Sequence, residues 1–288
     1  MSHSLDVHAY HNLLRSFLAE DLGAGDITTD NVVSATQHAR GEVIAKAPLV
    51  LAGIDLFVEV FRLLDSATKA EICHDDGEEL EPGQIPVRVT ASARALLTGE
   101  RVALNLLQRL SGVATSTRKF VYAVSGTNAE ILDTRKTTPG LRALEKYAVR
   151  AGGGRNHRKD LSEAVLIKEN HIRLAGGVPE ALAAAQAAKG RAAWIEIEVT
   201  NVDELHASLA YTPDVILLDN MTPTQVRQAV QQVRAHDPSR NIRTEASGGI
   251  TLGNVRQFAE AGVDWISVGA LTHSAPAVDL SFEIEPLR

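Results

Sequence analysis

From residue 116 onward the chain alternates short apolar runs with amphipathic segments, and this alternation constrains the fold more than any other feature. Six runs have the length and character of buried strands, at 129–133, 164–167, 194–199, 215–218, 242–246 and 265–268. Segments of helical periodicity separate them, at 141–151, 179–188, 202–211, 223–235 and 252–261. Strands separated by helices predict right-handed βαβ units in a parallel sheet, either a barrel or an open doubly wound sheet. A dinucleotide-binding fold is disfavoured, because no Gly-x-Gly-x-x-Gly follows the first of these strands.

Residues 1–115 have a different pattern and are expected to form a separate α+β layer. Helices are expected around 13–18, 54–64 and 100–110, and strands at 39–46, 70–73 and 87–93. The run Ile27–Thr29 is expected to be extended, because β-branched residues favour strands. The helix at 100–110 is expected to end at Ser111–Gly112. The chain is therefore expected to divide near residue 115.

Composition excludes several classes of protein. The 288 residues carry a net charge of −7 and only 4% aromatic residues, which argues against a nucleic-acid partner. With Cys73 as the single cysteine, neither an internal disulfide nor a thiolate metal cluster can form. No secretory signal is expected at the N-terminus, and no membrane span is expected because no run of 18 apolar residues occurs. A cytoplasmic location is expected.

Each of the six expected strands is followed by glycine or a polar residue. In a parallel barrel these strand ends surround one opening, which is the active face. The residues concerned are Arg135, Lys136, Lys168, Glu198, Asp219, Ser247, Gly248, Gly249 and Gly269. Cations, carboxylates and glycine loops around one opening predict a binding site. The alternative interpretation, in which the charges only mark the ends of strands, is disfavoured for the whole set.

The glycine loops after the last two strands predict a phosphate site. Glycine lets backbone N–H groups approach an anion, and paired loops at this place are the usual phosphate site of barrel enzymes. Glu198 and Asp219, from neighbouring strands, could bind Mg²⁺, hydrogen-bond sugar hydroxyls or act as an acid/base pair. Beside a phosphate site, magnesium or ribose is the favoured interpretation.

The segment from Arg135 to Arg173 holds the densest positive charge. It contains ten Lys or Arg against four Asp or Glu, a net of +6, so the rest of the chain carries −13. Such asymmetry in an acidic protein indicates a site for an anionic small molecule. Arg142, Lys146 and Arg150 recur every four residues, which is typical of a solvated helix face, and we expect them to lie outside the site.

The motifs of this segment resemble those of quinolinate phosphoribosyltransferases. The resemblance runs through Asp133–Thr-Arg-Lys-Thr-Thr-Pro-Gly-Leu-Arg142, Gly152–Gly-Gly-Arg-Asn-His-Arg158 and Leu166–Ile-Lys-Glu-Asn-His171. It continues in Glu20–Asp-Leu-Gly-Ala-Gly-Asp-Ile-Thr-Thr29, Glu196–Ile-Glu-Val199, Leu217–Leu-Asp-Asn-Met221 and Glu245–Ala-Ser-Gly-Gly-Ile250. The similarity covers nearly the whole chain.

The resemblance implies an α/β fold with an N-terminal α/β sandwich domain and an open six- or seven-stranded α/β barrel. The sandwich would comprise residues 1–115 with the tail 275–288 returning to it, and the barrel residues 116–274. The implied reaction converts quinolinate and phosphoribosyl pyrophosphate to nicotinate mononucleotide, pyrophosphate and CO₂, with Mg²⁺, in NAD biosynthesis. A homodimer, or a hexamer built as a trimer of dimers, is implied, with Arg101 completing the neighbouring subunit's site.

The resemblance also implies roles for individual residues. Quinolinate would be bound by Arg101, Arg135, His157, Arg158 and Lys168. The ribose and magnesium would be held by Glu198 and Asp219, directly or through water. The phosphates would be bound by Lys136, Ser247, Gly248, Gly249, Gly269, Ala270 and His273. The catalytic residues would be Lys136, Lys168, Glu198 and Asp219.

Three alternatives remain open at this point. A related phosphoribosyltransferase could act on another acceptor such as nicotinate, although one carboxylate would leave four cations in excess. Lys168 could form a Schiff base in an aldolase. The basic segment could bind nucleic acid without catalysis, which salt-sensitive binding would reveal.

Overall fold

The structure is a computed structural model that describes residues 5–287. Residues 1–4 and Arg288, which the sequence analysis assigned to the first domain and its tail, lie outside the described residues. The chain divides into two compact units. Unit 1 contains the residues up to Arg118, the segment Tyr147–Gly153 and the stretch from Ala275 onward, and unit 2 contains Lys119–Lys146 and Gly154–Ser274.

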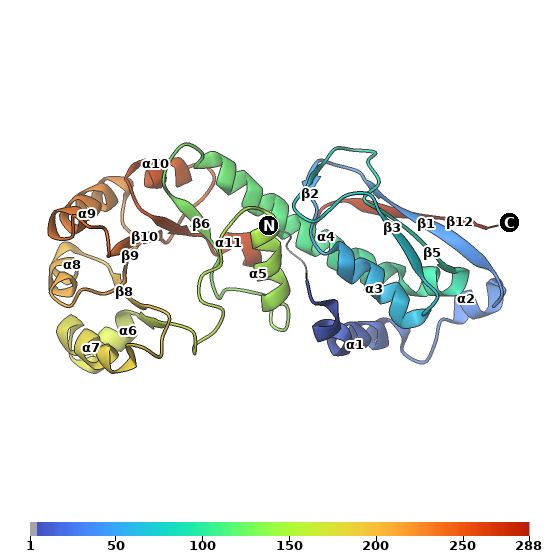
Figure 1. The fold of residues 1–288 in the computed structure, drawn as a ribbon, viewed down its shortest axis with the longest axis horizontal. Helices are drawn as coiled ribbons and strands as arrows, with labels where there is room; N and C mark the ends of the chain where they lie inside the picture. Colours follow the sequence, from blue (N-terminus) through green and yellow to red (C-terminus); the bar gives the residue numbers. More distant parts are fainter. Residues whose placement is uncertain (1–4, 288) are drawn as a thin grey trace. The chain divides into compact units, whose positions relative to one another are not determined.

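Unit 1 is built on an antiparallel sheet with the strand order β12-β1-β5-β3. Its strands are β1 (His38–Ala45), β3 (Lys69–Ile72), β5 (Val87–Ser92) and β12 (Leu280–Pro286). A second, two-stranded sheet pairs β2 (Leu49–Val50) with β4 (Glu79–Leu80). Figure 1 shows β12, in red, beside β1, in blue, so the last strand of the chain is part of this sheet.

The helices of unit 1 are η1 (Val7–Tyr10), α1 (His11–Leu22), α2 (Ile27–Val32), α3 (Ile54–Leu64) and the start of α4 (Ala93–Ala123). Helix α3 buries most of its residues, as its strongly apolar sequence predicts. The rings of Phe57 and Phe61 meet edge to face at 5.2 Å, and Phe282 of β12 stacks on Phe61 at 5.5 Å. Gly41 of β1 makes room for this ring, because a Cβ there would lie 2.1 Å from Phe282.

Two local predictions for this part of the chain were wrong. Ile27–Thr29 begins helix α2 instead of being extended, because the Asp26 carboxylate caps the helix and accepts a hydrogen bond from Thr29 N at 2.9 Å. Helix α4 does not end at Ser111–Gly112 but continues to Ala123. Gly112 serves close packing, since a Cβ there would lie 2.0 Å from the Pro276 carbonyl oxygen.

Unit 2 is built on a six-stranded parallel sheet with the order β6-β11-β10-β9-β8-β7. The strands are β6 (Glu130–Leu132), β7 (Val165–Ile167), β8 (Ile195–Val199), β9 (Val215–Asp219), β10 (Arg243–Ser247) and β11 (Trp265–Ser267). All six strands predicted from the apolar runs are confirmed. Because β6 and β7 end this order without pairing as strands, the barrel is open and six-stranded over residues 5–287.

Helices connect these strands, and those that follow β7, β8, β9 and β10 lie along the outside of the sheet (Figure 1). The helices are α5 (Arg142–Ala151), α6 (Glu169–Ala175), α7 (Val178–Ala185), η2 (Gln186–Ala188), α8 (Val202–Leu209), α9 (Pro223–His236), α10 (Val255–Glu260) and α11 (Ala270–His273). Helices α6 and α11 were not predicted, because seven and four residues are too short to establish a periodicity. Within residues 5–287, no helix is both long and apolar enough to cross a membrane.

Candidate active site

A cavity of about 580 Å³ lies in unit 2 where the parallel strands end. Ten residues proposed from the sequence line it: Arg135, Lys136, His157, Arg158, Lys168, Glu198, Asp219, Ser247, Gly248 and Gly249. Six further residues complete the lining: Thr134, Leu166, Leu217, Asn220, Glu245 and Ser267. The expected clustering of polar residues at the carboxyl ends of the strands is thus present in the structure.

The basic side of the cavity is formed by Arg135, Arg158 and Lys168. Arg158 is buried, and its Nη1 donates a hydrogen bond to the Ala164 carbonyl oxygen at 2.9 Å. Burial and the charge of Arg135 lower the pKa of Arg158. The Arg135 Nε is buried and has no hydrogen-bond partner among the described residues. Two guanidinium groups that repel each other in this way are well suited to an anionic ligand.

His157 is held between two buried carboxylates. Its Nε2 lies 3.1 Å from Glu196 Oε2 and 3.4 Å from Glu245 Oε2. Burial opposes the charged imidazole, whereas the contacts with Glu196 and Glu245 favour it and raise the pKa of His157. The other ring nitrogen, Nδ1, accepts a hydrogen bond from Arg158 N at 2.8 Å, so the ring proton in this geometry is on Nε2 and faces the two carboxylates. Glu196 and Glu245 were not predicted as site residues, although both stand inside the quoted motifs.

The acidic side of the cavity consists of Glu198 and Asp219, which come from neighbouring strands β8 and β9. Burial raises the pKa of both carboxyl groups, and the charge of Lys168 opposes the rise in each. Lys168 Nζ lies 3.6 Å from Glu198 Oε2. Two half-buried carboxylates of this kind are oxygen donors that Mg²⁺ accepts.

The glycine loops bring backbone close to the cavity. Gly248 has a φ of +92°, and a Cβ there would lie 2.2 Å from Asn220 Oδ1. A Cβ at Gly269 would lie 3.1 Å from Lys136 Cδ and 3.2 Å from the His273 ring. Thr272 Oγ1 donates to the Lys136 carbonyl oxygen at 2.7 Å, which ties α11 to the Lys136 loop. Gly269, Ala270 and His273 do not line the cavity themselves, but Gly269 lies beside Lys136, which does.

Lys146 is not on a solvated helix face, and that prediction was wrong. Its side chain is 4% exposed and its Nζ donates to Asp133 Oδ1 and, at 2.9 Å, to the His157 carbonyl oxygen. Asp133 Oδ1 also accepts from His157 N at 2.9 Å. Burial raises the pKa of Asp133 and lowers the pKa of Lys146, so each needs the other to stay charged. This pair fixes the backbone of His157.

Arg142 also contacts the loop that follows Arg135 and Lys136, whereas Arg150 is exposed as predicted. Arg142 Nε donates to Thr137 Oγ1 at 3.0 Å. Glu145, which is fully buried, accepts from Thr138 N at 3.0 Å and from Thr138 Oγ1 at 2.8 Å. Helix α5 therefore holds the loop that follows Arg135 and Lys136. The four-residue spacing of the basic residues concealed this role, because buried and exposed helix faces can share it.

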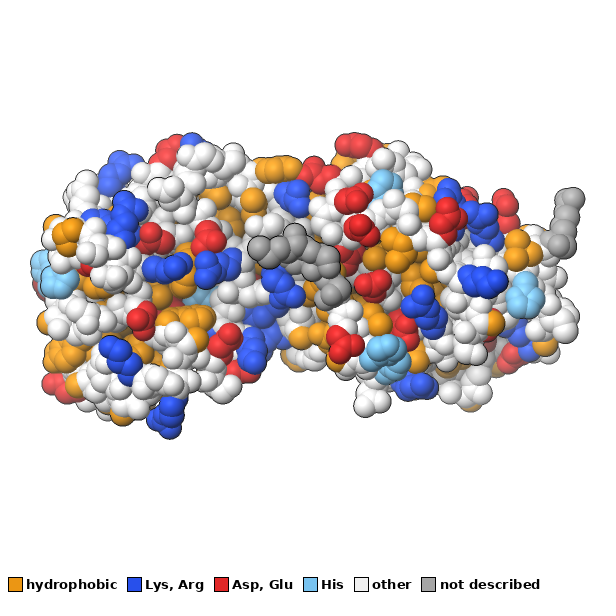
Figure 2. Space-filling view, viewed as in Figure 1, with side chains coloured by type: hydrophobic (Ala, Val, Ile, Leu, Met, Phe, Trp, Pro, Cys, Tyr) orange, Lys and Arg blue, Asp and Glu red, His pale blue; other side chains and the backbone are white. Residues whose placement is uncertain are grey.

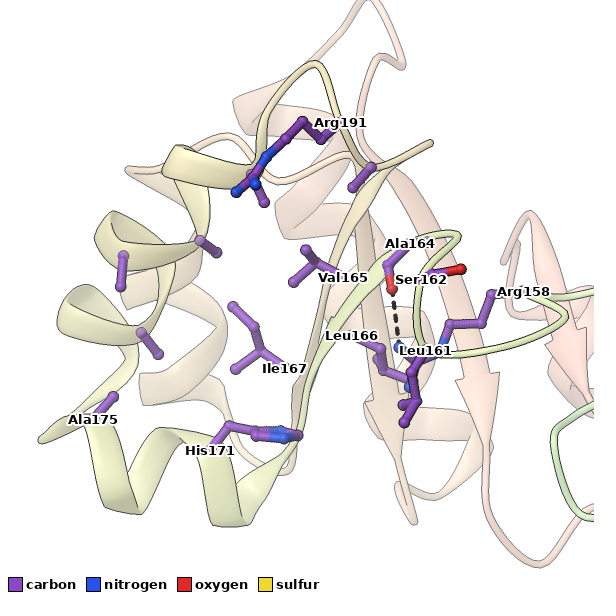
Figure 3. Close-up of a pocket in the computed structure, with 15 residues that line it drawn as sticks. Arg158, Leu161, Ser162, Ala164, Val165, Leu166, Ile167, His171, Ala175 and Arg191 are labelled. Carbon is purple, nitrogen blue, oxygen red and sulfur yellow. Dashed lines mark hydrogen bonds between the residues drawn. The ribbon is translucent and has the colours of Figure 1, made fainter.

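A second cavity of about 570 Å³ lies between β7 and helices α6 and α7. Figure 3 shows Val165 and Ile167 directed toward these helices and Leu166 toward the other side of the strand. The lining is mostly alanine and other apolar side chains. Arg158 lies at the edge of this cavity, where its hydrogen bond to Ala164 is drawn (Figure 3). We therefore place the chemistry in the cavity at the strand ends, where the charged groups gather.

Arg101 belongs to α4 in unit 1, and its side chain is exposed. Its Nη2 lies 3.8 Å from the neighbouring Glu100 carboxylate.

On the face drawn in Figure 2, basic and acidic side chains are interspersed rather than separated into one basic field. This face therefore lacks the basic field that binding to nucleic acid requires.

Comparisons with known proteins identify the family. Residues 26–111 match the family model "Quinolinate phosphoribosyl transferase, N-terminal domain", and residues 113–283 match the corresponding "C-terminal domain" model. The nicotinate-nucleotide pyrophosphorylase (carboxylating) of Mycobacterium leprae is 43% identical over 96% of this chain and 97% of its own. A Bacillus subtilis protein named "Probable nicotinate-nucleotide pyrophosphorylase (carboxylating)" is 44% identical over 94% of this chain and 92% of its own.

A solved structure agrees with these relatives. The crystal structure of NadC from Streptococcus pyogenes superimposes with a TM-score of 0.93, at 37% identity and over 99% of both chains. The fold class expected from the resemblance is thus confirmed, and so is the resemblance itself. The chain belongs to the quinolinate phosphoribosyltransferase family.

Proposed function

We propose that this cavity transfers the phosphoribosyl group of phosphoribosyl pyrophosphate to the ring nitrogen of quinolinate. The products are nicotinate mononucleotide, pyrophosphate and CO₂, and the reaction serves NAD biosynthesis. One observation carries the proposal: in a chain of this family, four cationic side chains line the same cavity as two carboxylates and a glycine loop. The cationic residues are Arg135, Lys136, Arg158 and Lys168.

Quinolinate has two adjacent carboxylates, and the basic side of the cavity suits both. Arginine binds a carboxylate through two parallel hydrogen bonds, and the unpartnered Nε of Arg135 is available for one. His157 lines the same cavity, where Glu196 and Glu245 hold its ring, and would complete this side of the site. Nicotinate, with one carboxylate, would leave part of this charge unmatched, which favours quinolinate as the acceptor.

The phosphoribosyl donor fits the opposite side. Backbone at Gly248 and Gly249, with Ser247 and Lys136, would bind its 5′-phosphate and pyrophosphate. Gly269, with Ala270 and His273 of the helix α11 that follows it, would extend this phosphate site, because Gly269 lies beside Lys136.

Mg²⁺ would be held by Glu198 and Asp219, directly or through water, and would neutralise charge on the departing pyrophosphate. These two carboxylates would also favour the positive charge that develops on the ribose carbon as the bond to pyrophosphate breaks. Burial raises the pKa of Glu198, and Lys168, at 3.6 Å, opposes that rise and so favours the carboxylate. The catalytic residues proposed here are therefore Lys136, Lys168, Glu198 and Asp219.

Decarboxylation follows from the charge of the product ring. Once the ring nitrogen carries the ribose it is cationic, so the electron pair left at C2 when CO₂ departs is stabilised next to it. A proton then takes the place of CO₂ at C2. The protein contributes position and charge, and no covalent nucleophile is needed.

The same proposal includes an assembly. Arg101 of a second subunit would complete the quinolinate site, in a homodimer or a hexamer of three dimers. The cytoplasmic location suggested by the single cysteine also stays a prediction.

A turnover assay with quinolinate and phosphoribosyl pyrophosphate tests the proposal. We expect nicotinate mononucleotide to accumulate only when both substrates and Mg²⁺ are present. An aldolase using Lys168 would instead be labelled by borohydride with a carbonyl substrate, without need of a phosphoribosyl donor. The contact of Lys168 Nζ with Glu198 Oε2 at 3.6 Å disfavours that interpretation, because the nitrogen faces a carboxylate. Absence of product under all conditions would reject the proposed function.

A further inference from the structure

We propose that His8, His11 and Glu59 form a binding site for one Zn²⁺ ion in unit 1. The three residues come from η1, α1 and α3, and one ligand atom from each lies within 4.8 Å of the others. They belong to the other unit from the cavity described above, and their proposed role does not depend on the function proposed for that cavity.

The geometry around His11 is that of converging ligand atoms. His11 Nε2 lies 2.7 Å from Glu59 Oε1 and 3.3 Å from His8 Nδ1. A neutral imidazole has a proton on one nitrogen and a lone pair on the other. If His11 Nε2 carries a hydrogen and donates it to Glu59, no hydrogen is left on that nitrogen for His8 Nδ1 to accept. If His11 Nε2 is unprotonated, its lone pair faces a carboxylate. One cation among the three atoms satisfies all of them.

The distances suit tetrahedral zinc. With Zn–N bonds of about 2.0–2.1 Å, two tetrahedral ligand nitrogens stand about 3.3 Å apart, which is the His8–His11 separation. The His11–Glu59 contact of 2.7 Å is shorter, so the carboxylate oxygen would withdraw by about 0.6 Å on binding. A water molecule would take the fourth position.

The surroundings orient the ligands. Glu59 is 5% exposed, in a helix face that is otherwise apolar, so its charge requires compensation. Arg62 Nη1 lies 3.5 Å from its other oxygen, Oε2, which leaves Oε1 directed at the histidines. Asp6 Oδ1 accepts from His8 N at 3.2 Å and caps η1, which fixes the backbone that carries His8. Such outer contacts are what metal ligands commonly have.

The donor set selects the metal. Two imidazoles and one carboxylate suit zinc and its neighbours among the first-row transition metals, whereas Mg²⁺ prefers oxygen ligands. Bound Zn²⁺ would join η1 and α1 to α3 and so tie the start of the chain to the core of unit 1. Removal of the ion would therefore lower the melting temperature of the protein.

Titration of ZnCl₂ into the full-length protein tests the site by calorimetry, with no affinity tag and with Mg²⁺ in excess. We expect one equivalent to bind to the wild type, and His8→Ala and His11→Ala each to weaken binding by at least about tenfold. His74→Ala is the matched control, because His74 also lies 2.7 Å from a carboxylate, that of Glu78, and should leave binding unchanged. Since His8 is exposed, its replacement should not disturb folding.

Co²⁺ supplies an independent readout, since the visible absorption of four-coordinate cobalt reports its ligands. Wild-type and His74→Ala proteins should show this absorption with one equivalent of Co²⁺, and His8→Ala should lose it. The proposal is overturned if wild-type protein binds no zinc, or if His8→Ala binds Zn²⁺ and Co²⁺ as the wild type does.

Discussion

Lys146→Met removes one partner of the buried pair that holds His157. Lys146 Nζ bonds both Asp133 and the His157 carbonyl, so the substitution leaves the Asp133 carboxylate buried without its countercharge. Breaking a buried ion pair in this way costs about 3–5 kcal/mol. Domains have total stabilities of about 5–15 kcal/mol, so the loss is a large share of the total.

The same change should also weaken quinolinate binding. Asp133 accepts from His157 N at 2.9 Å, and Arg158 follows directly in the chain, so the positions of both side chains depend on this anchor. We expect the KM for quinolinate to rise by at least about tenfold, because a misplacement of about 1 Å can cost two orders of magnitude in rate.

Urea denaturation and steady-state kinetics measure the two effects, with Arg150→Met as the matched control. Arg150 is one helical turn further along α5 and exposed, where its guanidinium lies 5.7 Å from the Tyr147 ring centroid, a contact of about 1 kcal/mol or less. The double variant Asp133→Asn/Lys146→Met should recover much of the stability, because no unpaired charge remains. Equal denaturation midpoints for Lys146→Met and Arg150→Met would refute the reasoning.

Three further predictions concern the cavity. Glu198→Gln should raise the Mg²⁺ concentration needed for half-maximal activity by about tenfold or more, as a magnesium titration would show, and an unchanged requirement would exclude Glu198 as a ligand. Burial raises the pKa of the Glu198 and Asp219 carboxyl groups, so both take up a proton at a higher pH than exposed carboxyl groups do. The Mg²⁺ concentration needed for half-maximal activity should thus begin to rise while the pH is still above 4.5, the ordinary value for a glutamate, and a requirement that stays constant down to that pH would contradict this. Gly248→Ala should raise the KM for phosphoribosyl pyrophosphate about tenfold, because its Cβ would clash with Asn220, whereas Gly253→Ala, whose Cβ meets only Thr251 at 3.8 Å, should have little effect.

The barrel strands were predictable because each is a short apolar run bounded by polar residues. This local signal needs no knowledge of distant contacts, so Val215–Asp219 and its neighbours were found within one or two residues. Helix α2 was missed because the capping contact of Asp26 outweighed the β propensity of Ile27 and Thr28. The length of α4 was missed because Gly112 serves contact with Pro276, which lies far along the sequence.

The site was predictable to the extent that its residues directly follow strands. Arg135, Lys168 and Asp219 follow or end strands of one parallel sheet, so all three lie at the edge where those strands end. Lys146 was placed wrongly because its spacing matches that of Arg142 and Arg150, while the burial that separates them depends on Asp133. The role of Arg101 rests on the family resemblance alone, because neither strand order nor periodicity connects it with the cavity.

The most direct test of the central claim is the ratio of CO₂ released to nicotinate mononucleotide formed, measured with quinolinate carrying a labelled C2 carboxyl group. If the site binds both carboxylates of quinolinate, the ratio should be one and the release of CO₂ should require phosphoribosyl pyrophosphate. Nicotinate should be a far poorer acceptor. Arg135→Ala should cut this release by about 30-fold or more while the fold survives, because the charged hydrogen bond from its guanidinium to a carboxylate of quinolinate is lost. Product formation from nicotinate at the same rate, or near-normal turnover in Arg135→Ala, would contradict the account.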